Sequence, residues 1–185
     1  MADKSKSSSY QVRLAQQIDV LSIANILAIS FYHKYPQWFY PLAVWSLSLD
    51  LGLRLLDPDP RYACLIATSN LDFEAIATLE LSIRSIPSLN AVPYLNWQTS
   101  PQPYISNLAV HPQWRKQGIA LKLLMAVEHK VRSWGFKSIY LHVMDSNLAA
   151  FNLYQVSGYK LYKLDPEFRL NPFARDQRLL LRKFL

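Results

Sequence analysis

The sequence predicts an α/β fold in which one mixed sheet carries helices on its faces. Segments with apolar residues at helical spacing alternate with short apolar runs that suit strands. Their order is strand, helix, helix, three strands, helix, strand, helix and two strands, so helices and strands have to share one core. The chain has 185 residues, of which 51% are hydrophobic and 18% charged, a composition that suits one globular domain with a sizeable core.

The first half of the chain is expected to hold two helices and three strands. The predicted elements are a strand over 11–16, a helix over 19–35 capped by Asp19, a helix over 43–56 that ends at the breaker DPDP, and strands over 61–69 and 74–86. Four prolines over 87–103 predict a loop there. Residues 31–45 contain seven aromatic side chains, which could form a wall against a substrate, part of the core, or a contact between two copies.

The second half is expected to alternate strands and helices. The predicted elements are a strand over 104–110 that stops at His111-Pro112, a helix over 118–134 with Gly135 as its left-handed stop, a strand over 138–144, a helix over 147–158, and strands over 159–164 and 177–185. Residues 1–9 are polar and Ser-rich, without the apolar core of a signal peptide. We expect them to be a disordered tail, with a single domain over 10–185.

Composition limits the partners and the compartment. The formal net charge of +7 favours acidic partners such as phosphorylated cofactors, but the cations are scattered, which argues against a nucleic-acid partner. Cys64 is the only cysteine, so an intramolecular disulfide is excluded and a reducing, cytoplasmic location is expected. No window approaches about eighteen uninterrupted apolar residues, so no membrane partner is expected. The four histidines form no cluster that suggests a metal site.

Arg115, Lys116 and Gly118 stand together at the start of the predicted helix over 118–134. The stretch matches neither of the familiar glycine-rich phosphate fingerprints. The first amides of a helix nevertheless lack intrahelical partners and lie at the positive end of its dipole, and a glycine lets backbone approach an anion closely. Two interpretations follow: a pyrophosphate-binding nest, or an ordinary junction between a loop and a helix.

A second pattern lies in the predicted helix over 147–158. Asn147, Ala150 and Tyr154 are spaced by three and four residues, so a helix places them along one face. A phenol with a pKa of about 10 is a weak base at neutral pH but can donate a proton to a departing thiolate. Tyr154 could equally be a partly buried aromatic of an amphipathic helix.

A histidine, His142, lies in the predicted strand over 138–144, between aliphatic neighbours. Side chains alternate between the faces of a strand, so His142 shares its face with Tyr140 and Met144. A histidine in this setting is either a structural residue or a base, and its case as a base depends on whether it faces the same cleft as Tyr154.

Two motifs, at the separation and on the elements expected, resemble the GCN5-related N-acetyltransferases (GNAT superfamily). The acetyl-CoA loop of that family, Q/R-x-x-G-x-G/A, is matched by Arg115, Gly118 and Ala120, and its later motif, N-x-x-A-x-x-x-Y-x-x-x-G-F/Y, by Asn147, Ala150, Tyr154, Gly158 and Tyr159. The close resemblance covers 104–159, and the predicted order of elements extends it over most of the chain. It implies the GNAT fold, a mixed, mostly antiparallel sheet of about seven strands flanked by about four helices.

The resemblance also implies a role for each matching residue. Acetyl-CoA would be the cosubstrate, and no metal would be needed. Its pyrophosphate would be held by the amides over Arg115, Lys116, Gln117, Gly118, Ile119, Ala120 and Leu121, and its pantetheine arm by Asn147 and the backbone of Leu108, Ala109 and Val110. An amide near Leu108 would polarise the acetyl carbonyl, and Tyr154 would protonate the leaving thiolate.

Within the superfamily, the chain looks most like protein N-terminal acetyltransferases, including the RimI type and cyanobacterial or plastid members. RimI-type enzymes carry a Glu general base at the position of His142. In a eukaryotic relative acting on chains that begin with Met, the histidine of L-H-V and the tyrosine that opens Y-I-x-x-L do that work. His142 and Tyr104 match those two positions. An imidazole with a pKa of about 6.5 can accept a proton, through water, from an incoming amine.

This reasoning favours a protein or peptide amine as the acceptor. An α-amino group has a pKa of about 8 and a lysine about 10.4, so neutralising a lysine at pH 7 costs about 3 kcal/mol more. We therefore expect transfer to peptide N-termini first and to lysines second. The alternatives are a GNAT enzyme acting on a small-molecule amine and a regulatory module that binds acetyl-CoA without turnover. Ribosome association stays open, and no oligomeric state is predicted.

Overall fold

The computed structural model describes residues 10–32, 35–57, 59–70, 74–87, 99–164 and 177–185. Its elements are β1 (Tyr10–Leu14), η1 (Gln17–Asp19), α1 (Val20–Phe31), η2 (Gln37–Phe39), α2 (Tyr40–Leu56), β2 (Ala63–Ser69), β3 (Ala75–Pro87), β4 (Thr99–Val110), η3 (Pro112–Trp114), α3 (Ile119–Ser133), β5 (Ser138–Met144), α4 (Leu148–Val156), β6 (Lys160–Leu164) and β7 (Arg178–Phe184). The predicted order of helices and strands is confirmed. The expected tail over 1–9 lies outside the described residues.

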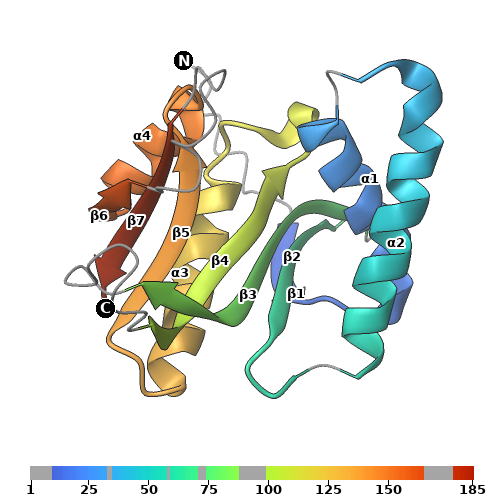
Figure 1. The fold of residues 1–185 in the computed structure, drawn as a ribbon. Coiled ribbons are helices and arrows are strands. Elements are labelled where there is room, and N and C mark those ends of the chain that lie inside the picture. The colour runs from blue at the N-terminus through green and yellow to red at the C-terminus, as the bar shows by residue number, and fades with distance from the viewer. Residues whose placement is uncertain (1–9, 33–34, 58, 71–73, 88–98, 165–176) are drawn as a thin grey trace, which may run out of the picture. The chain divides into compact units, whose positions relative to one another are not determined.

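The strands of the described residues form one seven-stranded sheet in the order β1-β2-β3-β4-β5-β7-β6 (Figure 1). The pairs β1–β2, β5–β7 and β6–β7 are antiparallel, whereas β4 and β5 are parallel. A parallel pair needs a long crossover connection, and α3 provides it between these two strands. The predicted mixed, mostly antiparallel sheet is therefore confirmed, as is the α/β fold class.

The chain divides into two compact units. Residues up to Glu80 together with Asn107–Ala126 form the first unit, and Leu81–Ser106 with Val127–Leu185 form the second. The core of the first unit brings α1 and α2 onto β2: its buried residues are Ile23, Ile26, Leu27, Leu51, Cys64, Ile66, Ala75 and Ala109. A core cluster of the second unit consists of Ile86, Tyr104, Tyr140 and Leu180, with Tyr162 packed against them.

Asp19 differs from its predicted role as a helix cap. It occupies the position before α1 but makes no capping hydrogen bond to that helix. Its carboxylate instead accepts hydrogen bonds from the Gln16 amide at 2.7 Å and from the Arg13 guanidinium at 2.7 and 2.8 Å. Burial alone would raise the pKa of Asp19, but these hydrogen bonds and the Arg13 charge outweigh it and lower the pKa. Asp19 is the last residue of the 3-10 turn η1, and its carboxylate forms a capping box with Gln16, the N-cap of that turn, instead of capping α1.

The prediction of a loop over 87–103 is partly wrong. Pro87 ends β3 and Thr99 already begins β4, while 88–98 lie outside the described residues. Proline lacks the N–H that a sheet ladder needs, which is why Pro101 and Pro103 argued against a strand. Pro101 lies among the exposed first residues of β4, whereas Pro103 is buried directly before Tyr104. Gly135, by contrast, has φ +82° two residues after the end of α3 at Ser133, as predicted for a left-handed helix stop.

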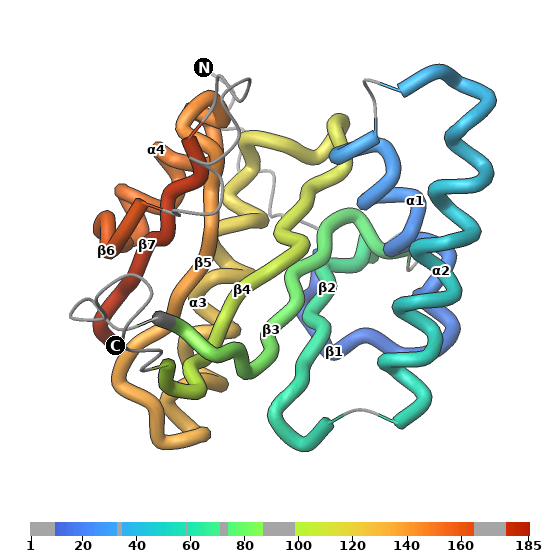
Figure 2. Tube along the Cα trace, in the orientation of Figure 1, coloured from blue at the N-terminus to red at the C-terminus, as the bar shows by residue number. Residues whose placement is uncertain are grey.

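One helical stretch of the described residues, Gln37–Leu56, passes a length and composition test for crossing a membrane, with 11% of its residues buried. Core helices pass the same test, so it is weak evidence for a membrane partner. In the first unit α2 runs beside α1 (Figure 2), and Leu51 of α2 belongs to the core. The expectation of no membrane partner stays a prediction.

Candidate functional site

The loop that joins β4 to α3 has an unusual backbone in the first unit. Lys116 has φ +60° and Gly118 φ +77°, so two left-handed residues are separated by one position. A Cβ built on Gly118 would meet nothing within 4 Å. The backbone conformation, rather than crowding, is therefore what favours glycine at this position. Arg115, Lys116, Gln117 and Gly118 are all exposed.

The amides of 116–121 donate to no described residue. The next amide along the chain, that of Lys122, donates to the Gly118 carbonyl at 3.1 Å. A row of unpaired amides at a helix N-terminus, with left-handed residues that turn it into a concave surface, binds anions. The structure thus provides what the nest interpretation of RKQGIA requires, and these residues fit a pyrophosphate.

Arg115 contributes to this loop in a way that the sequence did not indicate. Its Nε donates to the Val110 carbonyl at 3.0 Å, across the turn from the end of β4 to the loop. The side chain therefore braces the loop and brings a positive charge beside the nest. Lys116, the neighbouring cation, is exposed.

A further left-handed residue lies within β4 itself. Asn107 has φ +53°, and its side-chain amide donates to Glu80 Oε1 at 2.8 Å. Because a left-handed residue turns the chain within a strand, the hydrogen bond fixes the direction in which Leu108–Val110 continue. The recorded register of β4 with β5 consists of Tyr104 opposite Tyr140 and Ile105 opposite Leu141, and ends two residues before Asn107.

Glu80 is the buried centre of this arrangement. Its side chain is 1% exposed and its second oxygen accepts from Arg54 and, at 3.2 Å, from the Tyr62 hydroxyl. Burial and the nearby Glu80 charge raise the pKa of Tyr62. Sequence reasoning missed Glu80 and Asn107. The signal that could have found Glu80 is a carboxylate inside the apolar run ATLELSI, since an acidic residue is rarely buried without partners.

In the second unit, the two residues that the resemblance assigned to proton removal, Tyr104 and His142, lie together. The Tyr104 hydroxyl and His142 Nδ1 are 2.8 Å apart, which is a hydrogen bond. The parallel pairing of β4 and β5 explains the contact, because Tyr104 is opposite Tyr140 and His142 is the next residue on the same face. The Tyr104 side chain is buried, and the Arg84 guanidinium lies 4.3 Å from the centre of its ring.

Tyr154 is buried on α4 in the same unit. Burial, with a smaller contribution from Tyr104, raises the pKa of Tyr154 to about 12. The phenol therefore keeps its proton throughout the neutral range. Its ring meets that of Tyr159 edge to face at 5.8 Å, so the buried-aromatic interpretation is correct as far as packing goes. The two interpretations are compatible, since a buried phenol can still present its hydroxyl.

These features can be compared with known proteins. The Acetyltransferase (GNAT) family matches residues 20–159. The chain belongs to the GNAT family. The matched residues include the whole stretch over 104–159 that carries the two motifs. The assignment of these motifs to the GNAT family is therefore confirmed.

Relatives of this GNAT chain include plant and archaeal proteins. It is 29% identical to GCN5-related N-acetyltransferase 10, chloroplastic, of Arabidopsis thaliana over 68% of the chain and 50% of that protein. It is 24% identical to an N-alpha-acetyltransferase of Sulfurisphaera tokodaii over 88% of the chain and 87% of that protein. The chain spans half or less of the length of the chloroplastic relatives it matches.

Solved structures agree on the fold. The NatC complex bound to a Gag peptide and CoA contains a chain that superposes with a TM-score of 0.65 at 20% identity, covering 96% of this chain and 99% of that one. At this identity the likeness concerns the fold, and it confirms the predicted GNAT fold.

Asn147 has a structural role in this GNAT chain besides the predicted one. It is the N-cap of α4, and its side-chain oxygen accepts from the Ala150 amide at 3.2 Å. The spacing of Asn147 from Ala150 and Tyr154 had placed it on the helix face, whereas it precedes the first helical residue, Leu148. The side chain is exposed, and its contact with a pantetheine arm stays a prediction. Among the described residues no group of three or more His, Cys, Asp or Glu could hold a metal ion.

Proposed function

We propose that this GNAT chain is an acetyl-CoA-dependent N-acetyltransferase whose acceptor is a protein or peptide amine, N-terminal α-amines first and lysines second. The observation that carries the proposal is the hydrogen bond between the Tyr104 hydroxyl and His142 Nδ1, a pair suited to taking a proton from an amine. The archaeal relative named as an N-alpha-acetyltransferase supports the choice of acceptor, as does the NatC complex with its bound peptide.

The unpaired amides of 116–121 would hold the pyrophosphate of acetyl-CoA, which supplies an activated acetyl thioester. Arg115 and Lys116 add positive charge at that point. The backbone of Leu108, Ala109 and Val110 and the side chain of Asn147 would hold the pantetheine arm. The Leu108 amide, whose direction follows from the turn at Asn107, would donate to the acetyl oxygen.

The Tyr104–His142 pair would remove the proton that the amine loses when it attacks. With the Tyr104 hydroxyl donating to Nδ1, a neutral imidazole carries its own proton on Nε2. A proton accepted by the Tyr104 oxygen, directly or through one water, can then be matched by transfer of the phenolic proton to Nδ1. The tyrosine ends unchanged and His142 ends as the imidazolium, so the charges balance.

The proposal includes a cytoplasmic location, supported by the single cysteine. Cys64 is 2% exposed, and burial, with a further contribution from Glu80, raises the pKa of its thiol to about 12. A thiol in this environment is an inert structural group and no disulfide former. Association with the ribosome would bring such an enzyme to nascent N-termini and remains open to test.

The proposal is tested by mass spectrometry of the proteins of a host that expresses the chain. New acetyl groups on N-terminal α-amines, with fewer on lysines, are the expected result. A purified-enzyme assay with a peptide, with the same peptide blocked at its N-terminus, and with small amines separates the alternatives. Transfer to small amines alone would replace the acceptor class, and the absence of any transfer would favour a regulatory module that binds acetyl-CoA without turnover.

A further inference from the structure

Helix α2 and the turn before it carry an apolar stripe that faces away from the core of the first unit. Its members are separated by three or four residues, so they lie along one face of the helix. They are between 50% and 76% exposed, and they are Trp38, Leu42, Trp45, Leu49, Leu53 and Leu56. The opposite side of α2 is apolar as well, because Leu51 is buried in the core and Leu47 and Leu55 pack against it.

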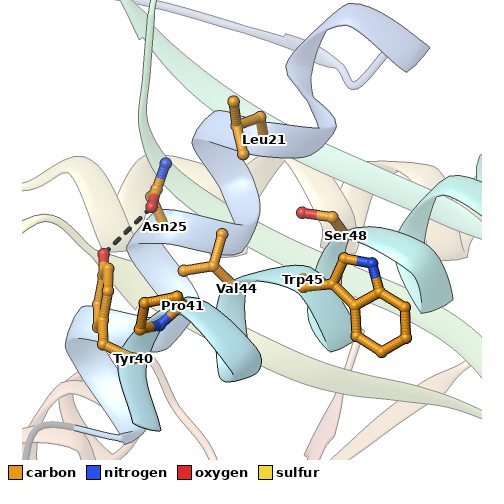
Figure 3. Close-up of a pocket in the computed structure, with 7 residues that line it drawn as sticks. All are labelled: Leu21, Asn25, Tyr40, Pro41, Val44, Trp45 and Ser48. Atoms are coloured by element: carbon orange, nitrogen blue, oxygen red, sulfur yellow. Dashed lines mark hydrogen bonds between the residues drawn. The ribbon is translucent and has the colours of Figure 1, made fainter. Parts of the chain in front are cut away.

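An open groove adjoins this stripe between α1 and α2. Its volume is about 470 Å³, and it is lined by Leu21, Asn25, Tyr40, Pro41, Val44, Trp45 and Ser48 (Figure 3). One end is closed by the Tyr40 hydroxyl, which donates to Asn25 Oδ1 at 3.1 Å. Along the groove, Ser48 Oγ is buried and has no hydrogen-bond partner among the described residues. A ligand for this groove should therefore be apolar and bring one hydrogen-bonding group.

A glycine interrupts the stripe at Gly52, three residues after Leu49. Its added Cβ would meet nothing within 4 Å, so packing within the chain does not require a glycine there. Glycine weakens a helix interior relative to alanine, and α2 continues for a full turn beyond Gly52. A gap of this kind in an exposed stripe is suited to receive a large side chain from a second helix.

We propose that the stripe is the contact between two copies of this chain, with their α2 helices packed antiparallel about a two-fold axis. The stripe offers about 600 Å² of apolar side-chain surface, which compares with a total of about 800 Å² per partner in a standard stable interface. A two-fold contact pairs each patch with itself. With the axis near Leu47, Trp45 lies opposite Leu49, and Leu42 lies opposite the gap at Gly52.

This arrangement also explains the groove. The second copy would bring an aromatic side chain to the edge of the groove near Ser48, since Trp45 stands one turn away on the same helix. An indole N–H is a donor that needs a partner when it becomes buried, and Ser48 Oγ is a buried acceptor without one. The contact would thus satisfy both groups.

A second copy fits the stripe better than a lipid surface does. Helices that lie on membranes carry lysines or arginines beside their apolar face. The stretch Gln37–Leu56 contains one cation, Arg54, and its guanidinium is already bonded to Asp50 and Glu80. The stripe therefore lacks free positive charge for anionic headgroups.

Sedimentation of the full-length chain over a range of micromolar concentrations tests the proposal. We expect a species of twice the 21.4 kDa chain mass, and we expect Leu49→Glu to reduce its association constant at least 100-fold. Met125→Glu is the matched control, because Met125 is a 61% exposed apolar residue of a different helix and should leave the dimer intact. Circular dichroism of both variants checks that each is folded.

Cysteine cross-linking locates the contact independently of stability. Cys64 is buried, so the wild-type chain should not cross-link under mild oxidation. A mixture of Trp45→Cys and Leu49→Cys chains, which this register places opposite each other, should give a covalent dimer, while Met125→Cys chains should not. A monomeric wild-type chain, or a dimer that survives Leu49→Glu, would overturn the proposal. If instead the wild-type chain were a monomer that binds vesicles of phosphatidylserine and phosphatidylcholine, and Leu49→Glu abolished this binding, the dimer proposal would be overturned and the stripe would be a membrane-binding surface.

Discussion

Replacing Glu80 with glutamine tests the buried carboxylate that holds Asn107 in its left-handed conformation. The two oxygens of Glu80 accept from three donors, on Asn107, Tyr62 and Arg54. A glutamine of the same shape has one accepting oxygen and one NH₂ group. Whichever way its amide is turned, at least one donor then faces another donor in a site that is 1% exposed.

The expected cost follows from the burial of the two charges. Removing one partner of a buried ion pair costs about 3–5 kcal/mol. Arg54 is 35% exposed and keeps Asp50 as a second partner, so its charge remains partly solvated and partly compensated after the change. We therefore expect Glu80→Gln to lower the free energy of unfolding by about 2–3 kcal/mol, at or below the lower limit of that range.

Urea unfolding at pH 7 measures this loss, and the chain provides a matched control. Asp50→Asn removes the other carboxylate bonded to the same guanidinium, but Asp50 is 63% exposed, so its loss should cost about 0.5 kcal/mol or less. Equal losses for the two variants, or a loss below about 1 kcal/mol for Glu80→Gln, would refute the argument from burial.

A second measurement on the same two variants addresses the site rather than stability. Because Asn107 directs the strand that continues into Leu108, we expect Glu80→Gln to reduce turnover at a temperature where both variants are fully folded. Asp50→Asn should not. A normal turnover number in folded Glu80→Gln would show that the turn at Asn107 does not depend on Glu80.

Three further predictions concern the proposed site. Gly118→Val should lower acetyl-CoA affinity at least tenfold by calorimetry, whereas Gly135→Val, at an equally left-handed position, should cost stability alone; equal affinity in the two variants would remove the nest. Tyr104→Phe and His142→Ala should each lower turnover about 100-fold and leave acetyl-CoA affinity unchanged. Because the two residues are expected to act as one unit, the double variant should be little slower than either single variant. Additive losses in the double variant would show that they act separately. Tyr154→Phe should lower turnover and flatten the dependence of unfolding free energy on alkaline pH. Because burial raises the pKa of Tyr154 from 10.0 to about 12, the folded wild-type chain loses up to about 2.7 kcal/mol of unfolding free energy between pH 10 and pH 12, and the variant should not. Equal urea profiles of the two chains between those pH values would contradict the burial of the phenol.

The sequence predicted the bounds of an element well where its hydrophobic periodicity was strong and where local residue preferences alone determine its end. The strand over 138–144 has the predicted bounds, and Gly135 ends its helix as expected. Pro101 and Pro103 misled the prediction because local preference forbids a proline only where the missing N–H is needed, which depends on the neighbouring strand. The left-handed φ of Asn107 could not be predicted, since it depends on a glutamate 27 residues away. The resemblance assigned Tyr104 and His142 to one role, but their contact could not be predicted from the sequence, because only the register of β4 with β5 brings residues 38 positions apart within 2.8 Å.

The pKa of Tyr154 sharpens what this residue can do in the proposed reaction. A proton moved from a group of pKa about 12 to an ordinary thiolate of pKa about 8.5 climbs about 5 kcal/mol. Full protonation of the departing thiolate by Tyr154 is therefore unfavourable, whereas a hydrogen bond that strengthens as negative charge develops is favourable and needs no transfer. The burial that raises the pKa keeps the phenol protonated near pH 8, where an α-amine becomes neutral and reactive. We therefore expect Tyr154 to act as a fixed hydrogen-bond donor to the departing thiolate, rather than to transfer its proton as the resemblance implies, with the thiolate protonated by solvent after it has left.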